Sequence, residues 1–121
     1  MIRSVKFVSI PVVDQERALK FYTERLGFVV NTDQPFDDKQ RWIELRIPKS
    51  STRVVLFTPP GQAERVGSFM NMAFETDNMD KTYTELKERG VEFTQPPKRE
   101  HWGCSALFKD SEGNQFCLSE Q

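Results

Sequence analysis

An internal repeat is the feature that most limits what this chain can fold into. In the first half, a β-branched and aromatic stretch predicts a strand that ends at Pro11. Asp14 is placed to cap a helix, and Gly27 stands where a glycine would end it. Apolar residues recur between them at helical spacing, which favours the same helix. Strands are expected near residues 5–10, 28–32, 42–47 and 53–58, with a polar loop at 34–39.

The second half runs through the same order of elements. Asp77 or Asn78 is placed to cap its helix, and Gly90 to end it. Pro96 and Pro97 are expected to open a loop, because proline interrupts regular pairing. Strands are expected near residues 69–75, 91–93, 104–109 and 114–119.

Each half therefore reads as a βαβββ module, at about residues 1–60 and 66–121. One such module is too small to bury both its helix and its sheet. We therefore expect the two modules to pack as a single domain of the α+β class over residues 1–121.

Charge and composition exclude several classes of partner. The chain has 17 basic and 18 acidic residues and no basic cluster, so we expect no nucleic-acid partner. It has no apolar run long enough to span a membrane. The N-terminus lacks a signal-peptide pattern and the two cysteines read as free thiols, which together predict a cytoplasmic protein. The single histidine excludes a metal centre built on two histidines of one chain.

Two stretches resemble a known superfamily. Residues 12–22, with 26–28, look like the start of vicinal oxygen chelate proteins. Residues 110–114 are similar to the Asp-Pro-Asp-Gly-Asn turn of that superfamily, from which Ser111 and Glu112 depart. Its members include glyoxalase I, bleomycin- and fosfomycin-resistance proteins and extradiol dioxygenases. The resemblance implies a cupped, partly open barrel of mixed β-sheet with the helices outside.

The same resemblance implies where a metal would be held. Metal-dependent members place four ligands on the first and last strands of the modules, and these positions fall on Phe7, Val55, Asn71 and Cys117. Phe7 and Val55 offer no donor atom, and an amide and a thiol alone make a poor ligand set. We therefore predict no metal, no other cofactor, and no glyoxalase or dioxygenase activity of the usual metal-dependent kind.

Strand alternation predicts which side chains line the cup. If Phe7 points into the cup, every second residue of each strand does so too. The remaining strand residues, which would face the helices, are almost wholly apolar, as a helix-covered face requires. The phase of the strand at 104–109 is ambiguous. Phe7, Trp42 and Phe57 are expected to stack on a planar ligand. The other residues expected to bind the ligand, in the cup or at its mouth, are Glu44, Arg46, Asn71, Glu75, His101, Trp102, Gln115 and Cys117.

Simpler interpretations stand beside these. Trp42 and Phe57 could merely fill the cup or form a dimer contact. Glu44 and His101 are the candidates for acid–base catalysis. The simpler interpretations are an exposed or arginine-paired glutamate and a surface histidine without a function. Cys104 and Cys117 read as small hydrophobic residues rather than nucleophiles.

The main hypothesis is a binding protein for a small planar or aromatic molecule, similar to bleomycin-resistance proteins and lacking the usual metal ligands. One alternative is a metal-dependent lyase or dioxygenase of the glyoxalase or extradiol type. Another is a metal-free enzyme that uses Glu44 or His101. Exposed sheet edges need cover, and modules of this superfamily often pair between chains, so a C2 homodimer is also expected.

Overall fold

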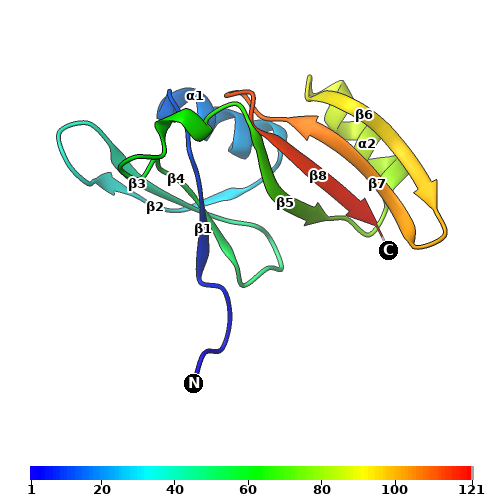
Figure 1. Cartoon of the computed structure of the whole chain (residues 1–121), viewed down its shortest axis with the longest axis horizontal. Coiled ribbons are helices and arrows are strands. Elements are labelled where there is room, and N and C mark those ends of the chain that lie inside the picture. The colour runs from blue at the N-terminus through cyan, green and yellow to red at the C-terminus, as the bar shows by residue number, and fades with distance from the viewer. Residues whose placement is uncertain (121) are drawn as a thin grey trace. The chain divides into compact units, whose positions relative to one another are not determined.

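The computed structural model describes residues 1–120, and the chain divides into two compact units (Figure 1). The N-terminal unit, Met1–Val66, contains β1 (Phe7–Ile10), α1 (Gln15–Lys20), the π-helical η1 (Phe21–Arg25), β2 (Val29–Pro35), β3 (Arg41–Arg46), β4 (Arg53–Leu56) and the 3₁₀ turn η2 (Ala63–Arg65). The C-terminal unit, Gly67–Gln121, contains β5 (Phe69–Glu75), α2 (Met79–Glu88), β6 (Glu92–Glu100), β7 (Gly103–Lys109) and β8 (Gln115–Glu120).

The two sheets share one topology. The strand order is β1-β4-β3-β2 in the N-terminal unit and β5-β8-β7-β6 in the C-terminal unit. The first strand of each unit pairs in parallel with the last, and the other neighbours pair antiparallel. The predicted α+β class and the βαβββ repeat are confirmed, and each sheet is open rather than closed into a barrel.

Both helices begin at a side-chain cap. The carboxylate of Asp14 accepts the N–H of Arg17 at 3.0 Å, as predicted. In the second helix the cap is Asn78 rather than Asp77, since its side chain accepts the N–H of Lys81 at 3.1 Å. No helix within residues 1–120 is long and apolar enough to cross a membrane.

The first helix ends in a wider turn than the spacing predicts. After α1 the chain continues as the π-helical η1, in which the N–H of Leu26 donates to the carbonyl of Phe21, five residues back, at 3.3 Å. Gly27 follows with a φ of +80°, a conformation that favours glycine, and ends the helix as expected.

The helix-facing side of each sheet forms the core. In the N-terminal unit the buried strand residues on this side are Ile10, Ile43, Leu45, Val54 and Leu56, and the helical residues are Ala18, Phe21 and Tyr22. In the C-terminal unit Met79 and Leu86 of α2 are buried together with Cys104, Ala106, Phe108, Phe116 and Leu118. The phase of β7 is thereby assigned, because Cys104, Ala106 and Phe108 are buried and Ser105, Leu107 and Lys109 alternate with them.

The prediction of a loop at Pro96 and Pro97 is wrong. Both prolines lie inside β6, which runs without a break to Glu100. β6 is an edge strand, and its pairing with β7 shifts register between Gln95 and Lys98. An edge position with an irregular ladder tolerates residues that lack an N–H, so the prolines do not end the strand.

Candidate ligand-binding site

Four aromatic rings meet in the N-terminal unit. Phe7 lies on β1, Trp42 on β3, Phe57 just after β4, and Phe36 just after β2. The Trp42 ring centroid lies 5.4 Å from that of Phe7, 5.2 Å from that of Phe57 and 6.1 Å from that of Phe36. Phe36 also packs edge-on against Phe57 at 4.8 Å. We call Phe7, Phe36, Trp42 and Phe57 the aromatic cluster.

The aromatic cluster lies on the sheet face away from α1. Trp42 alternates with the buried core residue Ile43, so its side chain projects from the opposite face. Val55, on β4 between β1 and β3, projects from the same face as Trp42 and is nevertheless 0% exposed. Phe7 of β1 and Trp42 of β3 contact each other across β4, the strand that carries Val55. The rings thus form an apolar layer on the sheet.

The outer part of the aromatic cluster is accessible. Phe57 is 6% exposed, whereas Phe7 is 36% and Phe36 59% exposed. Exposed rings at the edge of a packed aromatic layer offer flat surfaces to a ligand. The structure therefore brings Phe7, Trp42 and Phe57 into contact and adds Phe36 to them.

Phe36 is the residue that the sequence interpretation missed, because it lies in a stretch read as a polar loop. The loop is a tight turn in which the N–H groups of Phe36 and Asp37 both donate to the carbonyl of Gln40, each at 3.1 Å. The Asp37 carboxylate accepts the N–H groups of Lys39 and Gln40, each at 2.8 Å. These bonds hold the pKa of Asp37 below its ordinary value. The sequence does contain one indication of this role, because Phe36 is an aromatic residue within an otherwise polar stretch.

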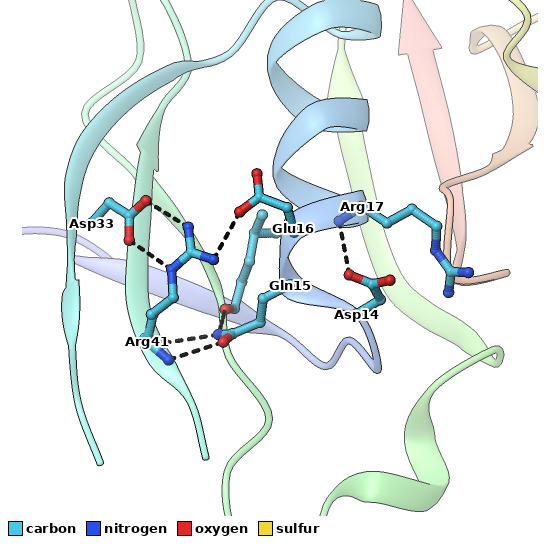
Figure 2. A network of polar contacts seen from close by, with 7 residues as sticks. Asp14, Gln15, Glu16, Arg17, Asp33 and Arg41 are labelled. Carbon is cyan, nitrogen blue, oxygen red and sulfur yellow. Dashed lines mark hydrogen bonds and ion pairs between the residues drawn. The ribbon is translucent and has the colours of Figure 1, made fainter. Parts of the chain in front are cut away.

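Two glutamine side chains hold the start of β3 and the end of β4, next to Trp42 and Phe57. Gln15, from α1, donates to the carbonyls of Arg41 and Leu56 at 2.8 Å each and accepts the N–H of Arg41 at 2.9 Å (Figure 2). Gln40 donates to the carbonyl of Thr58 at 2.8 Å and accepts its N–H at 2.9 Å. The two side-chain amides bond backbone groups of residues 41, 56 and 58, beyond the last backbone pair of β3 and β4. They therefore hold the backbone that carries Trp42 and Phe57.

Arg41 anchors β3 to two other elements. Its guanidinium bonds both carboxylate oxygens of Asp33 on β2, at 3.1 and 2.8 Å, and one oxygen of Glu16 on α1, at 2.9 Å (Figure 2). The bonds from Arg41 hold the pKa of Asp33 below its ordinary value. All three guanidinium nitrogens of Arg41 are thus engaged in structural bonds.

An open hollow of about 670 Å³ borders this network, lined by Val12, Gln15, Gln40, Arg41 and Thr58 among others. None of the four rings of the aromatic cluster lines it. The glutamine side chains bond the backbone, as described above, the Thr58 hydroxyl bonds the main chain of Val12, and Arg41 bonds two carboxylates. These four side chains of the lining are therefore engaged within the unit.

The predicted polar residues of the N-terminal unit lie beside the aromatic cluster. Glu44 accepts the side-chain amide of Asn31 at 2.8 Å, and Asn31 stands where the pairing of β2 with β3 shifts register. Arg46 is exposed at the end of β3, directly opposite Arg53 of β4. Glu44 is thus bonded by an amide rather than by an arginine.

The predicted residues of the C-terminal unit form two groups. On the sheet, Glu75 pairs with Ser119, and Cys117 lies opposite Ala73 and Leu107. Burial raises the pKa of the Cys117 thiol, which is therefore protonated near neutral pH. Gln115 lies opposite Lys109 and is half-buried.

Asn71 is a special case on β5. It has a φ of +55° and lies where the pairing of β5 with β8 is interrupted. Asparagine tolerates this left-handed conformation better than most residues. Strand alternation does not extend through such an irregularity, so it cannot assign the direction of the Asn71 side chain. No group of three or more His, Cys, Asp or Glu side chains that could hold a metal ion occurs within residues 1–120.

His101 and Trp102 form the turn between β6 and β7. Trp102 is 55% exposed, and both residues line a shallow hollow of about 280 Å³ together with Cys104 and Glu120. Glu120 accepts the N–H of Met79 at 2.7 Å and pairs with Arg99 at 3.2 Å, and these contacts lower its pKa. Both carboxylate oxygens of Glu120 are thus engaged by Met79 and Arg99 rather than by His101.

Comparison with known proteins gives consistent results. The model of the Glyoxalase/Bleomycin resistance protein/Dioxygenase superfamily matches residues 4–118. The YetH protein of Bacillus subtilis is 32% identical, and the match covers 99% of this chain and 100% of YetH. A superfamily member from Sphaerobacter thermophilus has a structure with a TM-score of 0.89 and 36% identity, covering 99% of this chain and 98% of that chain. TnmS3, an antibiotic-binding protein from a Streptomyces species, has a TM-score of 0.85 and 33% identity, covering 98% and 96%.

Proposed function

Because the chain belongs to the Glyoxalase/Bleomycin resistance protein/Dioxygenase superfamily, we propose that it binds a small planar or aromatic molecule without using a metal. The observation that carries the proposal is the aromatic cluster on the open sheet face of the N-terminal unit. A flat molecule laid against Phe7 and Phe36 would cover apolar ring surface that is now exposed to water.

The donor atoms present do not fit the metal chemistry of the superfamily. At the positions where the resemblance places ligands, Phe7 and Val55 have only carbon in their side chains, and Val55 is fully buried. Asn71 and Cys117 add one amide and one thiol, a donor set too small and too mixed to hold a divalent cation. We therefore derive no reaction step through a metal. In the described part of the chain, Glu44 is bonded to Asn31, and the carboxylate of Glu120, in the hollow that His101 lines, is bonded to Met79 and Arg99. Neither catalytic candidate is thus bonded to a second acid or base, which favours binding over catalysis.

The similarity to TnmS3 supports ligand binding, because that protein is described as an antibiotic-binding protein and shares its fold over nearly the full length. What this chain binds is a separate matter, since one fold serves many ligands. We propose that the face bearing the aromatic cluster is the surface that contacts the ligand here.

The proposal includes self-association in the cytoplasm. Each sheet leaves two edge strands, β1 and β2 in one unit and β5 and β6 in the other, and exposed edges favour pairing with another chain. A C2 homodimer is the simplest closed arrangement. Sedimentation equilibrium at micromolar concentration should give twice the mass of one chain, and a monomer there would refute the dimer.

Ligand binding is tested with Trp42→Ala and a neutral flat probe, 2-naphthylmethanol. Isothermal titration should show binding to the wild-type chain and a loss of about 5- to 150-fold in affinity for Trp42→Ala, since one stacking partner contributes about 1–3 kcal/mol. Trp42→Phe should retain most of the affinity because it keeps a ring at that position. Phe69→Ala is the matched control, because Phe69 is an exposed ring on β5 outside the aromatic cluster.

The unfolding midpoint is measured for every variant, so that affinity is compared only where the chain is folded. Unchanged affinity in folded Trp42→Ala would mean that the aromatic cluster only packs the sheet. A failure of the wild-type chain to bind any naphthyl compound, neutral or charged, would refute binding of planar molecules at this face. Metal analysis of the purified protein completes the test, because a stoichiometric divalent ion would refute a metal-independent function.

A further inference from the structure

Two arginines stand side by side next to the aromatic cluster. Arg46 of β3 is directly opposite Arg53 of β4, and Arg53 is directly opposite Phe7 of β1. Directly opposite residues of paired strands project from the same face, with side chains about 5 Å apart at their base. Phe7, Arg53 and Arg46 therefore form a row across three strands on the face that carries the aromatic cluster.

Neither guanidinium has an acidic partner in the part of the chain that the structure describes. Within residues 1–120, no carboxylate lies within ion-pair distance of Arg46 or Arg53. Arg41, on the same strand as Arg46, shows the contrast, because it bonds Asp33 and Glu16. Like charges directly opposite each other destabilise a sheet. The Arg46–Arg53 pair is therefore expected to lower the stability of the folded unit.

The nearest carboxylate along β3 does not relieve this pair. Glu44 lies one row away, opposite Val55, and its Oε2 accepts the amide of Asn31 at 2.8 Å. Arg46 and Arg53 thus keep their donors available. Two adjacent guanidinium groups supply planar, charged donors that match the oxygens of a carboxylate, sulfonate or phosphate.

The surrounding chain is also basic. Because β1 runs parallel to β4, the residues that precede Phe7 lie at the same end of the sheet as the turn between β3 and β4. The N–H of Arg53 donates to the carbonyl of Lys6 at 3.0 Å, which fixes this proximity. Residues 1–7 and 46–53 contain five basic residues, Arg3, Lys6, Arg46, Lys49 and Arg53, and no acidic residue. In a chain of net charge −1, this is a local concentration of positive charge.

We propose that the ligand of this face is an anion: a flat aromatic body with a carboxylate, sulfonate or phosphate group. The anionic group binds between Arg46 and Arg53, and the aromatic body lies on Phe7 and Trp42, whose ring centroids are 5.4 Å apart. This inference rests on the proposed function and adds to it the charge of the ligand and the two residues that select it. Glu44, being anionic itself, disfavours placing the charged group one row further along the sheet.

The test compares three naphthalene probes that differ only in charge: 2-naphthalenesulfonate, 2-naphthylmethanol and 2-naphthylmethylammonium. In isothermal titration of the wild-type chain, the sulfonate should bind about tenfold or more tightly than the alcohol, and the ammonium most weakly. Added sodium chloride should reduce the preference for the sulfonate, because salt screens exposed charges.

Substitutions then locate the selectivity. Arg46→Gln and Arg53→Gln should each weaken sulfonate binding by about five- to tenfold and leave binding of the alcohol unchanged. Lys81→Gln is the matched control: it removes one exposed positive charge from α2, in the other unit, and should leave all three affinities unchanged. Chemical-shift changes in the ¹H–¹⁵N spectrum should include the side-chain Nε–H groups of both arginines and the Trp42 indole.

The outcomes separate this inference from the proposed function. Equal affinity of the wild-type chain for the sulfonate and the alcohol would overturn the anionic ligand while leaving a planar ligand in place. So would arginine variants that lose no more sulfonate affinity than Lys81→Gln. If none of the three probes binds, the proposed function fails, and the anionic ligand fails with it.

Discussion

Replacing Asn114 with alanine should destabilise the C-terminal unit by about 2–4 kcal/mol. Asn114 is fully buried at the end of the turn between β7 and β8. Its Oδ1 accepts the N–H of Gly67 at 2.8 Å, and its Nδ2 donates to Oδ2 of Asp110 at 3.0 Å. The other oxygen of Asp110 accepts the N–H groups of Glu112 and Asn114, at 2.8 and 2.9 Å. The side chain of Asn114 thus ties the turn to the residue that begins the unit.

The magnitude follows from these two bonds. The bond from the Gly67 N–H is a neutral one, for which about 1 kcal/mol is typical, and the bond to the Asp110 carboxylate is charge-assisted, for which about 1.5–3 kcal/mol is typical. Alanine at position 114 would leave one oxygen of the buried Asp110 without this partner, together with the N–H of Gly67, which belongs to an exposed residue that water can reach. The bond to Asp110 therefore contributes most of the expected cost, and the bond from Gly67 adds about 1 kcal/mol or less.

The chain has two tryptophans, one in each unit, which allows each unit to be followed separately. In a Trp42→Phe background, the fluorescence of Trp102 reports urea unfolding of the C-terminal unit. Ser111→Ala is the control in the same turn, because the Ser111 hydroxyl contacts only the Glu112 side chain, at 3.0 Å, and its loss should cost about 0.5 kcal/mol or less. If Asn114→Ala unfolds within about 0.5 kcal/mol of Ser111→Ala, the reasoning about the turn is refuted.

Two titratable groups give further outcomes. Because bonds from Arg41 hold the pKa of Asp33 below its ordinary 3.8, the folded state binds fewer protons than the unfolded state near that pH. The resulting stability is present above about pH 4 and is lost as the pH falls through the folded-state pKa. In urea titrations, the free energy of unfolding of Asp33→Asn should therefore fall less on acidification than that of the wild-type chain. An equal fall would contradict this. Burial raises the pKa of the Cys117 thiol above its ordinary 9.0, so iodoacetamide should modify it at least about tenfold more slowly than glutathione at pH 7.5, as followed by mass spectrometry. A rate equal to that of glutathione would show that the thiol is not shielded.

Much of the fold follows from local pattern. The alternation of apolar and polar residues along residues 42–47 and 53–58 places Ile43, Leu45, Val54 and Leu56 in the core and Trp42 on the opposite face, and the structure agrees. Gly27 ends the first helix because its φ is positive, which is a property of the residue itself. Such features depend on neighbours a few residues away and can be read from the chain.

Other features depend on pairing, which the sequence does not state. Pro96 and Pro97 read as a loop, yet β6 is an edge strand with shifted register and accommodates both. Phe36 joins the aromatic cluster because the turn that carries it folds its ring back onto Trp42 and Phe57. The opposition of Arg46 and Arg53 is set by the register of β3 on β4, so no inspection of either strand alone reveals it. The expectation that both modules share one cup remains a prediction.

The parallel pairing of the first and last strands has a mechanical consequence. In the N-terminal unit the chain enters at the start of β1 and leaves from the end of β4, and these neighbouring strands point the same way. Tension applied to the two ends of the unit would pull β1 and β4 in opposite directions along their length. All bonds between them are then loaded at once, whereas an antiparallel hairpin pulled by its open end yields one bond at a time. β5 and β8 repeat the arrangement in the C-terminal unit, so each unit should resist stretching by shear and give way as a whole.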